Sequence, residues 1–163
     1  TRVYFPRLIV PLASVGVALV DLLVALMLLV PLMFWYGMVP GSSLLAVPLM
    51  IVVALLVTLG VGIGFAAVSV VFRDFRHIEP FIVQIWMFAS PVIYPLAAVP
   101  ARWRSFYVVN PMVGVVDTFR RAVIEGSGPD PLAFGTAVAV TAVALPLAYV
   151  VFKYTEATMA DVV

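Results

Sequence analysis

The chain has 163 residues, of which 65% are hydrophobic and only 10% are charged, whereas about 25% of the residues in a soluble domain are charged. This composition excludes an ordinary soluble domain and indicates an integral membrane protein. The net charge of +1 argues against a nucleic-acid partner, which needs a basic surface, and the absence of cysteine excludes disulfides and thiolate zinc sites.

The N-terminal part of the chain predicts two membrane-spanning helices. Residues 8–72 contain a single charged residue, Asp21, and this run is too long for one helix. The glycines and prolines of residues 36–43 are typical of a turn, and they divide the run into spans at residues 8–35 and 44–72. Each span exceeds the roughly 20 residues that cross a bilayer, which implies tilt or extension beyond the lipid.

A charged segment and a third span follow. Residues 73–80 hold the densest charge cluster of the chain, so they form either a solvated turn or a docking surface for a soluble partner, where charges of both signs give complementarity. The next residues, 81–101, carry no charge but contain three prolines. We therefore expect a span at residues 81–94 with a broken far end, because proline removes a backbone donor and the break needs cover from protein.

Residues 95–126 predict short helices that lie in the membrane interface or dip into it. Asn110 suits a helix N-cap, Pro111 suits the first helical position, and Gly126 suits the helix end. Apolar residues recur at i, i+3 and i+4 spacing along this helix. The charged i,i+4 pairs on its opposite face are Asp117 with Arg121 and Arg121 with Glu125.

A last span at residues 132–152 ends at Lys153. The predicted fold class is therefore all-α, a polytopic transmembrane helix bundle of about four spans with short interfacial or re-entrant helices. Lysine and arginine residues slightly favour the side that holds the 73–80 loop, which we expect to be cytoplasmic. The sequence begins at Thr1 without an initiator methionine, and we expect it to be part of a longer chain.

Motifs for catalysis and cofactor binding are absent from the sequence. It contains no GxxxxGK[ST] phosphate loop, no H-E-x-x-H motif and only one histidine, His77. We therefore expect this chain to be no enzyme and to bind neither a metal nor a cofactor. Gly60 and Gly64 form a GxxxG pair, which predicts close packing against another helix.

Three residues inside predicted spans have both a structural and a functional interpretation. Asp21 is costly within a bilayer, by about 2.5–3.5 kcal/mol on insertion scales. It either lines a polar pathway or, as we favour, holds two helices in register as a paired or protonated carboxylate. Trp86 and Phe88 either offer ring faces to a ligand or belong to the core, and we favour the core.

Several segments, in order along the chain, resemble the permease subunit of ABC-2 type exporters, in particular the branch that exports O-antigen, teichoic acid and related polysaccharides. The resembling segments are Phe5-Pro6-Arg7, Arg73-Asp74-Phe75, Ser90-Pro91-Val92-Ile93-Tyr94, Asn110-Pro111-Met112 with Arg120, and Lys153 with Glu156 and Asp161. Gly114 departs from the broader family signature, which prefers a polar or aromatic residue there. The resemblance covers residues 1–163 as a single transmembrane domain and corresponds to the C-terminal two-thirds of a six-span permease.

The resemblance implies a mechanism. Two permease copies in a bacterial inner membrane would form a channel for a lipid-linked glycan, as in lipopolysaccharide biosynthesis, and two separate subunits would bind ATP and Mg and hydrolyse the ATP. The residues that it implies for docking the ATP-binding subunit are Arg73, Asp74, Arg76 and Glu79. Those that it implies for the channel are Trp86, Phe88 and Tyr94. Those that it implies for an outer gate, within short helices at residues 95–126, are Pro95, Asn110, Pro111 and Arg120.

Three alternatives remain open from the sequence. An ABC-2 permease for a small drug or lipid would share the fold. An ion-coupled secondary carrier would need several ionisable groups inside the membrane, where only Asp21 is present. A membrane enzyme acting on lipid-linked sugars would need convergent acids, for which Asp117, Glu125 and Asp130 are a thin set.

Overall fold

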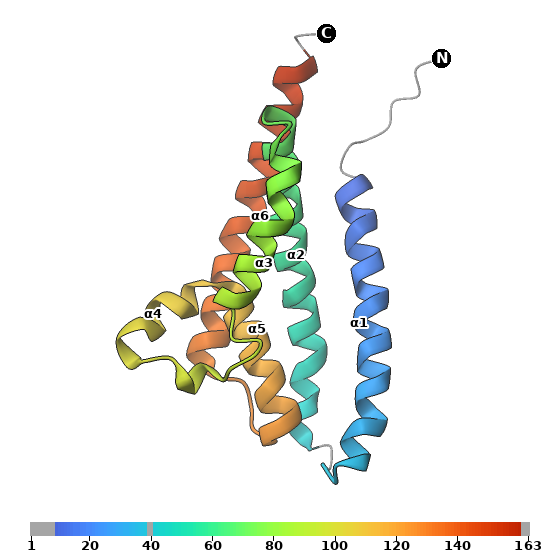
Figure 1. Cartoon of the computed structure of the whole chain (residues 1–163), viewed down its shortest axis with the longest axis vertical. Helices are drawn as coiled ribbons and strands as arrows, with labels where there is room; N and C mark the ends of the chain where they lie inside the picture. Colours follow the sequence, from blue (N-terminus) through green and yellow to red (C-terminus); the bar gives the residue numbers. More distant parts are fainter. Residues whose placement is uncertain (1–8, 39–40, 161–163) are drawn as a thin grey trace.

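The computed structural model describes residues 9–38 and 41–160, and within them every regular element is a helix (Figure 1). The element order is α1 (Ile9–Trp35), the 3-10 turn η1 (Ser42–Leu45), α2 (Ala46–Val71), α3 (Phe75–Ala89), the 3-10 turn η2 (Leu96–Ala98), α4 (Ala101–Val109), α5 (Pro111–Arg120), the π-helical turn η3 (Arg121–Glu125) and α6 (Pro131–Ala160). The family-like segment Phe5-Pro6-Arg7 and the tail residue Asp161 lie outside the described residues.

Three of the described helices are long and apolar enough to cross a membrane. Their spans are Leu12–Trp35, Ser42–Val71 and Pro131–Glu156, each longer than the roughly 20 residues that a bilayer requires. They run side by side in Figure 1, and α1 and α2 are joined at one end by a turn in which Gly37 adopts φ +69°. The prediction of an all-α membrane bundle is confirmed.

The third expected span, at residues 81–94, differs from the helix that forms there. α3 begins earlier, at Phe75, and ends at Ala89 after 15 residues, a length of about 22 Å against a hydrocarbon core of about 30 Å. The helix ends because Ser90 precedes Pro91, and a residue before proline is driven to extended backbone; Ser90 has ψ 143°. α3 therefore falls short of crossing the membrane by itself.

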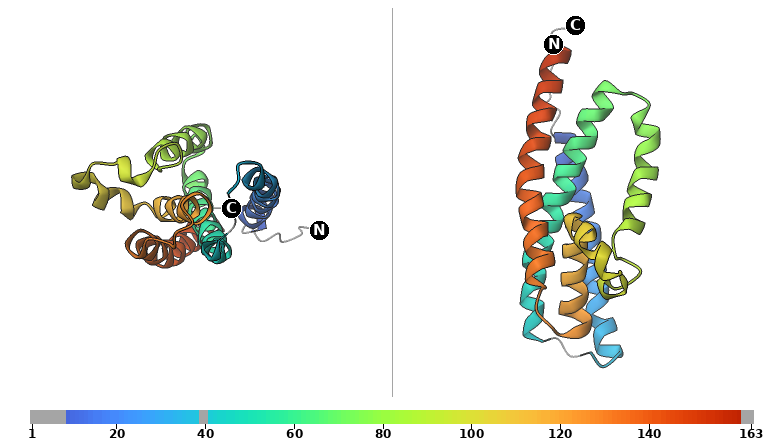
Figure 2. Two further views of the ribbon diagram at one scale, coloured as in Figure 1. Left: turned by 90° about the horizontal axis from the view of Figure 1, so that it is seen from below. Right: turned by 90° about the vertical axis from the view of Figure 1, so that its left-hand side faces the viewer.

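α4 and α5 form a re-entrant pair beside the first turns of α6. The hydroxyl of Thr136, the sixth residue of α6, donates to the carbonyl of Val108 at the end of α4 (3.2 Å), about 8 Å along α6 from its start. Pro111 at the start of α5 shares a cavity wall with Thr141, about 15 Å along the same helix. α5 then returns toward the start of α6, so both short helices lie beside the span rather than beyond its end (Figures 1 and 2).

The core lies between α2, α5 and α6, whereas α1 stands at the edge of the bundle (Figure 2). Three apolar clusters make up this core. The first joins Met50, Val53 and Val57 of α2 to Val115 of α5, the second joins Ile63 and Ala67 to Phe152, and the third joins Leu96, Val99, Val108, Val113 and Ala133. α5 is therefore packed from both sides, by a spanning helix on each.

Glycines permit the closest helix contacts. Gly60 of the expected GxxxG pair lies against Leu145 of α6, where an added Cβ would be 3.5 Å from the Leu145 Cα, but Gly64 has no neighbour within 4 Å of such a Cβ. The tightest contact is at Gly114 of α5. A Cβ there would overlap the backbone carbonyl oxygen of Ala133 and lie 2.7 Å from the Cβ of Ala137. Gly114, which departs from the family signature, is thus required by the α5–α6 approach.

We expect Gly114→Ala to destabilise the protein by about 1–3 kcal/mol, because the new methyl group forces α5 away from α6. Gly135→Ala is the matched control, since Gly135 is exposed on α6 with no atom within 4 Å of an added Cβ, and alanine favours a helix by about 1 kcal/mol. The midpoint of thermal unfolding in detergent should fall for Gly114→Ala and hold or rise for Gly135→Ala. Equal midpoints for the two variants would contradict the close contact.

Candidate functional site

Asn110 forms the junction between α4 and α5. It ends α4 with extended backbone (φ −72°, ψ 114°), and its Oδ1 accepts a hydrogen bond from the backbone N–H of Met112 (3.1 Å). Pro111 occupies the first helical position, where its missing N–H is no loss. The predicted N-cap is confirmed.

The same side chain connects α5 to the end of α3. The indole Nε1 of Trp86 donates to Asn110 Oδ1 (3.0 Å), and Asn110 Nδ2 donates to the Oγ of Ser90 (3.0 Å). Ser90 Oγ in turn donates to the carbonyl of Trp86 (2.9 Å). We call Trp86, Ser90, Asn110 and Met112 the Asn110 cluster. All polar atoms of the asparagine side chain are thereby used, and residues 20 or more positions apart are held together.

Arg120, at the other end of α5, holds the segment that follows α3. Its Nη2 donates to the carbonyl of Val92 (3.0 Å) and lies 3.5 Å from that of Pro91. These carbonyls have left the helix and lack helical donors, and arginine supplies five N–H groups in a fixed arrangement. The non-helical segment 90–92 is therefore held at one end by Asn110 and at the other by Arg120. We call Asn110, Arg120 and residues 90–92 the clamp.

Two tyrosines lie beside this clamp. The Tyr94 hydroxyl donates to the carbonyl of Phe88 (3.1 Å) and lies 3.3 Å from the hydroxyl of Tyr107. That hydrogen bond to Tyr107, with partial burial, raises the pKa of Tyr94 to about 12, so the phenol stays neutral at physiological pH. A cavity of about 560 Å³ opens here. Its walls are Tyr94, Ala98, Val99, Pro100, Trp103 and Tyr107.

An ion cluster joins the end of α5 to the start of α6. Arg121 Nε lies 3.0 Å from Asp117 Oδ2, and Arg121 Nη2 lies 3.9 Å from Asp130 Oδ2. Burial raises the pKa of Asp117, and the neighbouring Arg121 partly offsets this by lowering it. The predicted Asp117–Arg121 pair is present but on a buried carboxylate, and Arg121 reaches Asp130, where the sequence predicted Glu125.

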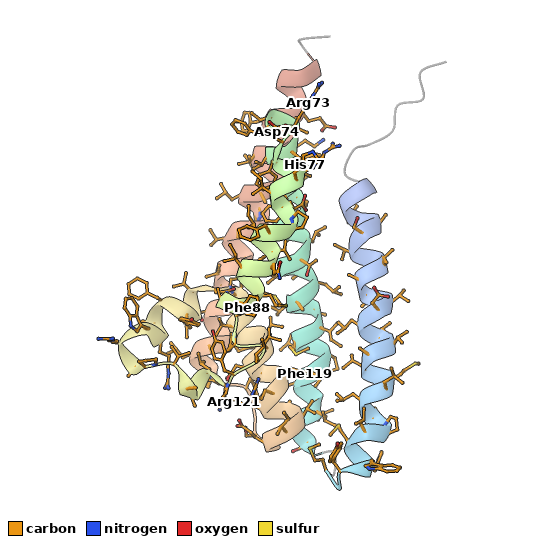
Figure 3. The ribbon with its side chains drawn as sticks, in the orientation of Figure 1. Arg73, Asp74, His77, Phe88, Phe119 and Arg121 are labelled. Carbon is orange, nitrogen blue, oxygen red and sulfur yellow. The ribbon has the colours of Figure 1, made fainter. Side chains whose placement is uncertain are left out.

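The expected channel aromatics have different surroundings. Trp86 is half-buried against the cluster of Met50 and Val115 and is fixed by Asn110, which favours its interpretation as a core residue. Phe88 is 54% exposed near the far end of α3 (Figure 3). Tyr94 is half-buried and faces the aromatic cavity.

The charged segment 73–80, expected as a loop, is helical from Phe75 onward and lies at the opposite end of the bundle from Asn110 and Arg120. Arg73, Asp74 and His77 are exposed there (Figure 3). Arg76, which is also exposed, and the half-buried Glu79 line a cavity next to α1 and α2. The four docking candidates of the sequence, which exclude His77, are thus divided. Arg73 and Asp74 lie at the tip, and Arg76 and Glu79 line the cavity.

Two other predicted residues stand apart from the clamp. Pro95 is exposed and precedes the 3-10 turn η2. Asp21 is exposed in the middle of α1 and forms no ion pair with another described residue.

A family model with the description ABC-2 type transporter matches residues 2–124, which include all of α1 to α5 and therefore the whole clamp. The chain belongs to the ABC-2 type transporter family. The resemblance seen in the sequence is confirmed, together with the assignment to a family of membrane transporters.

Curated relatives of this ABC-2 chain are polysaccharide transport proteins. The O-antigen export system permease protein RfbA of Myxococcus xanthus is 31% identical over 155 residues, which cover 94% of this chain and 60% of the relative. A protein of the same name from Klebsiella pneumoniae is 24% identical over 77% of this chain and 49% of the relative. The polysialic acid transport protein KpsM of Escherichia coli is 26% identical over 64% and 41%. The chain thus spans about half the length of the curated relatives it matches.

The Asn110 cluster generates a test with two single variants and their combination. We expect Asn110→Ala to cost about 1–3 kcal/mol, because it leaves the Trp86 indole N–H without a partner. Trp86→Phe should destabilise the protein less than Asn110→Ala, since it removes the indole donor together with its need for a partner. The double variant should lose less free energy of unfolding than the sum of the two single losses. Trp103→Phe, on an exposed indole, is the control. Strictly additive losses in the free energy of unfolding would show that the hydrogen bond contributes nothing.

Proposed function

We propose that this chain is the transmembrane permease part of an ABC exporter that moves lipid-linked polysaccharide across a bacterial inner membrane. A second copy of the chain and a separate ATP-binding subunit would complete the transporter. The names of the relatives support the substrate class, and family membership supports the ATP-binding partner. The structural observation that carries the proposal is the re-entrant pair α4–α5.

The position of α4 requires polar surroundings at the depth of the membrane. It carries two exposed arginines, Arg102 and Arg104, although its C-terminal end lies beside the second turn of α6. A charge inside a bilayer costs about 2.5–3.5 kcal/mol, and non-helical backbone is tolerated there only against protein or a water-filled cavity. The α3–α4 side therefore supports a polar pathway, which a second copy would close.

The aromatic cavity fits sugar rings. Tyr94, Trp103 and Tyr107 offer flat apolar faces with polar groups at their edges, and convergent hydroxyls on an apolar surface are typical of small-ligand sites. The exposed ring of Phe88 would extend this surface toward the pathway. Arg120 and Asn110 fix the segment that carries Tyr94, so they act as positioning residues for a gate that also contains Pro95 and Pro111.

The docking surface for the ATP-binding subunit would lie at the other end of α3. Arg73 and Asp74 are exposed at the tip of the segment between α2 and α3, where charges of opposite sign suit an electrostatically matched partner. Arg76 and Glu79 would form the edge of that surface. The partner would bind ATP and Mg, whereas this chain would act only as the pathway.

A membrane enzyme finds little support in the geometry of the acids. Asp117 and Asp130 are held by Arg121, and Glu125 Oε2 accepts a hydrogen bond from the Ser127 hydroxyl (3.4 Å). Groups that share such partners contribute to the α5–α6 connection. We therefore prefer the exporter.

The full-length protein, purified in mild detergent from its native membrane, should retain a soluble ATP-binding subunit in a 1:1 ratio by mass spectrometry. Arg73→Glu should reduce that retention about tenfold, as expected for the loss of charge-assisted contacts, while membrane insertion stays normal. Arg102→Glu, at the other end of the bundle, is the control for charge reversal. If the wild-type protein stays folded and retains no such subunit, the exporter assignment is wrong.

Substitutions at the clamp should affect export and leave subunit retention intact. Tyr94→Ala should lower surface polysaccharide about three- to tenfold, because ring packing contributes about 0.5–1.5 kcal/mol, and Tyr94→Phe should be milder because it keeps the ring. Arg120→Gln should reduce export by freeing the carbonyls of residues 91 and 92. Cell-surface polysaccharide in a strain that lacks the native gene gives the measurement. Loss of the ATP-binding subunit in either variant would contradict a gate role.

A further inference from the structure

A second cavity lies at the end of the bundle that carries the charged segment. It occupies about 670 Å³ between α1, α2, α3 and the C-terminal part of α6, within the roughly 300–1,000 Å³ of small-ligand sites. None of the contacts of the Asn110 cluster or of the aromatic cavity involves it. The exporter function proposed above uses Arg76 and Glu79 only at the edge of the docking surface and assigns the cavity itself no ligand.

The cavity is polar at its mouth and mainly apolar below. Ser69 lies near the end of α2, close to the charged segment, and Thr58 lies 11 positions earlier, about 16 Å deeper along the helix. The Thr58 hydroxyl already donates to the carbonyl of Ala54 (2.8 Å), so the deep wall offers little polarity. The apolar lining consists of Val15, Gly62, Ala66, Val70 and Phe152, and Ser14 of α1 adds one further hydroxyl. Such a gradient suits an amphiphile whose polar head stays at the membrane surface.

The mouth carries one charge of each sign. Arg76 and Glu79 both line the cavity from α3, one turn apart, so they lie on neighbouring positions of one helix face. Neither forms an ion pair with another residue in the part of the chain that the structure describes. A cation and a carboxylate that lie side by side without partners favour a ligand with both charges.

We propose that this cavity binds the head group of a zwitterionic phospholipid with a primary amine, a phosphoethanolamine lipid. Its phosphate would contact Arg76, its ammonium group would contact Glu79, and the first carbons of its acyl chains would lie along Val15, Gly62 and Ala66. A purely anionic lipid phosphate would bring its charge close to the Glu79 carboxylate. A primary ammonium donates three hydrogen bonds, which a choline head group lacks.

The test uses the full-length protein in complex with its partners, exchanged into vesicles of equal phosphatidylethanolamine, phosphatidylglycerol and phosphatidylcholine, with retained lipids counted by native mass spectrometry. We expect phosphatidylethanolamine to be retained over both others. Glu79→Gln should lower its preference over phosphatidylglycerol about tenfold, the loss of one charge-assisted hydrogen bond. Arg76→Gln should lower retention of both phosphatidylethanolamine and phosphatidylglycerol, because each loses the contact of its phosphate. Arg102→Gln, an exposed cation at the other end of the bundle and outside the cavity, should change the retention of neither lipid.

Gly62→Leu provides a second variant without a charge change. A side chain has open space at Gly62, so leucine should fill the cavity, reduce lipid retention and leave the fold intact. Equal retention of all three lipids, or a preference for phosphatidylglycerol that Glu79→Gln leaves unchanged, would overturn the proposal. Displacement by inorganic phosphate alone, or unchanged retention in Gly62→Leu, would also overturn it. Retention of the ATP-binding subunit is scored separately, so failure of the exporter assignment is distinguishable.

Discussion

A backbone that leaves helical geometry inside a bilayer must find its hydrogen-bond partners within the protein, because hydrocarbon supplies none. In this chain that constraint falls on the segment between α3 and α4. At the two ends of α5, Arg120 donates to the carbonyls of residues 91 and 92, and Asn110 donates to the hydroxyl of Ser90. α5 holds that position only because Gly114 lets it approach α6 closely. A glycine on one face of a ten-residue helix thus supports the polar clamp formed by its two ends.

Composition and short-range patterns predicted much of this architecture. The three long spans follow from charge-free runs that no soluble fold explains, and their ends follow from glycine, proline and charged residues next to them. The start of α5 was equally predictable, because asparagine is a preferred N-cap and proline is preferred at the first helical position, as at Asn110 and Pro111. Each of these signals lies within a few residues of the feature that it predicts.

Features that depend on contacts between distant residues could not be predicted from the sequence. The contact between Trp86 and Asn110 joins positions 24 apart, and no local spacing indicates it. The break after α3 lies at the first of the expected prolines, but no local pattern shows that Asn110 and Arg120 of α5 hold the segment that follows it. The sequence predicted that Asp117 and Arg121 pair on the face opposite the apolar stripe, whereas the Asp117 side chain is buried in the structure. In each case a tertiary contact decides the outcome.

The same contacts make α3 a continuous helical connection between the two ends of the bundle. None of its side chains is buried, and Figure 2 shows it standing apart from α2 over most of its length. Its start is held by the edge-to-face contact of Phe75 with Phe65, whose ring centroids are 5.3 Å apart. Its end is held by the Asn110 cluster. A helix fixed at both ends and loosely packed between them transmits displacement along its axis, because its internal hydrogen bonds resist compression while little side packing resists movement. Any force that a soluble partner applies next to Phe75 would therefore act directly on the segment that Asn110 and Arg120 hold.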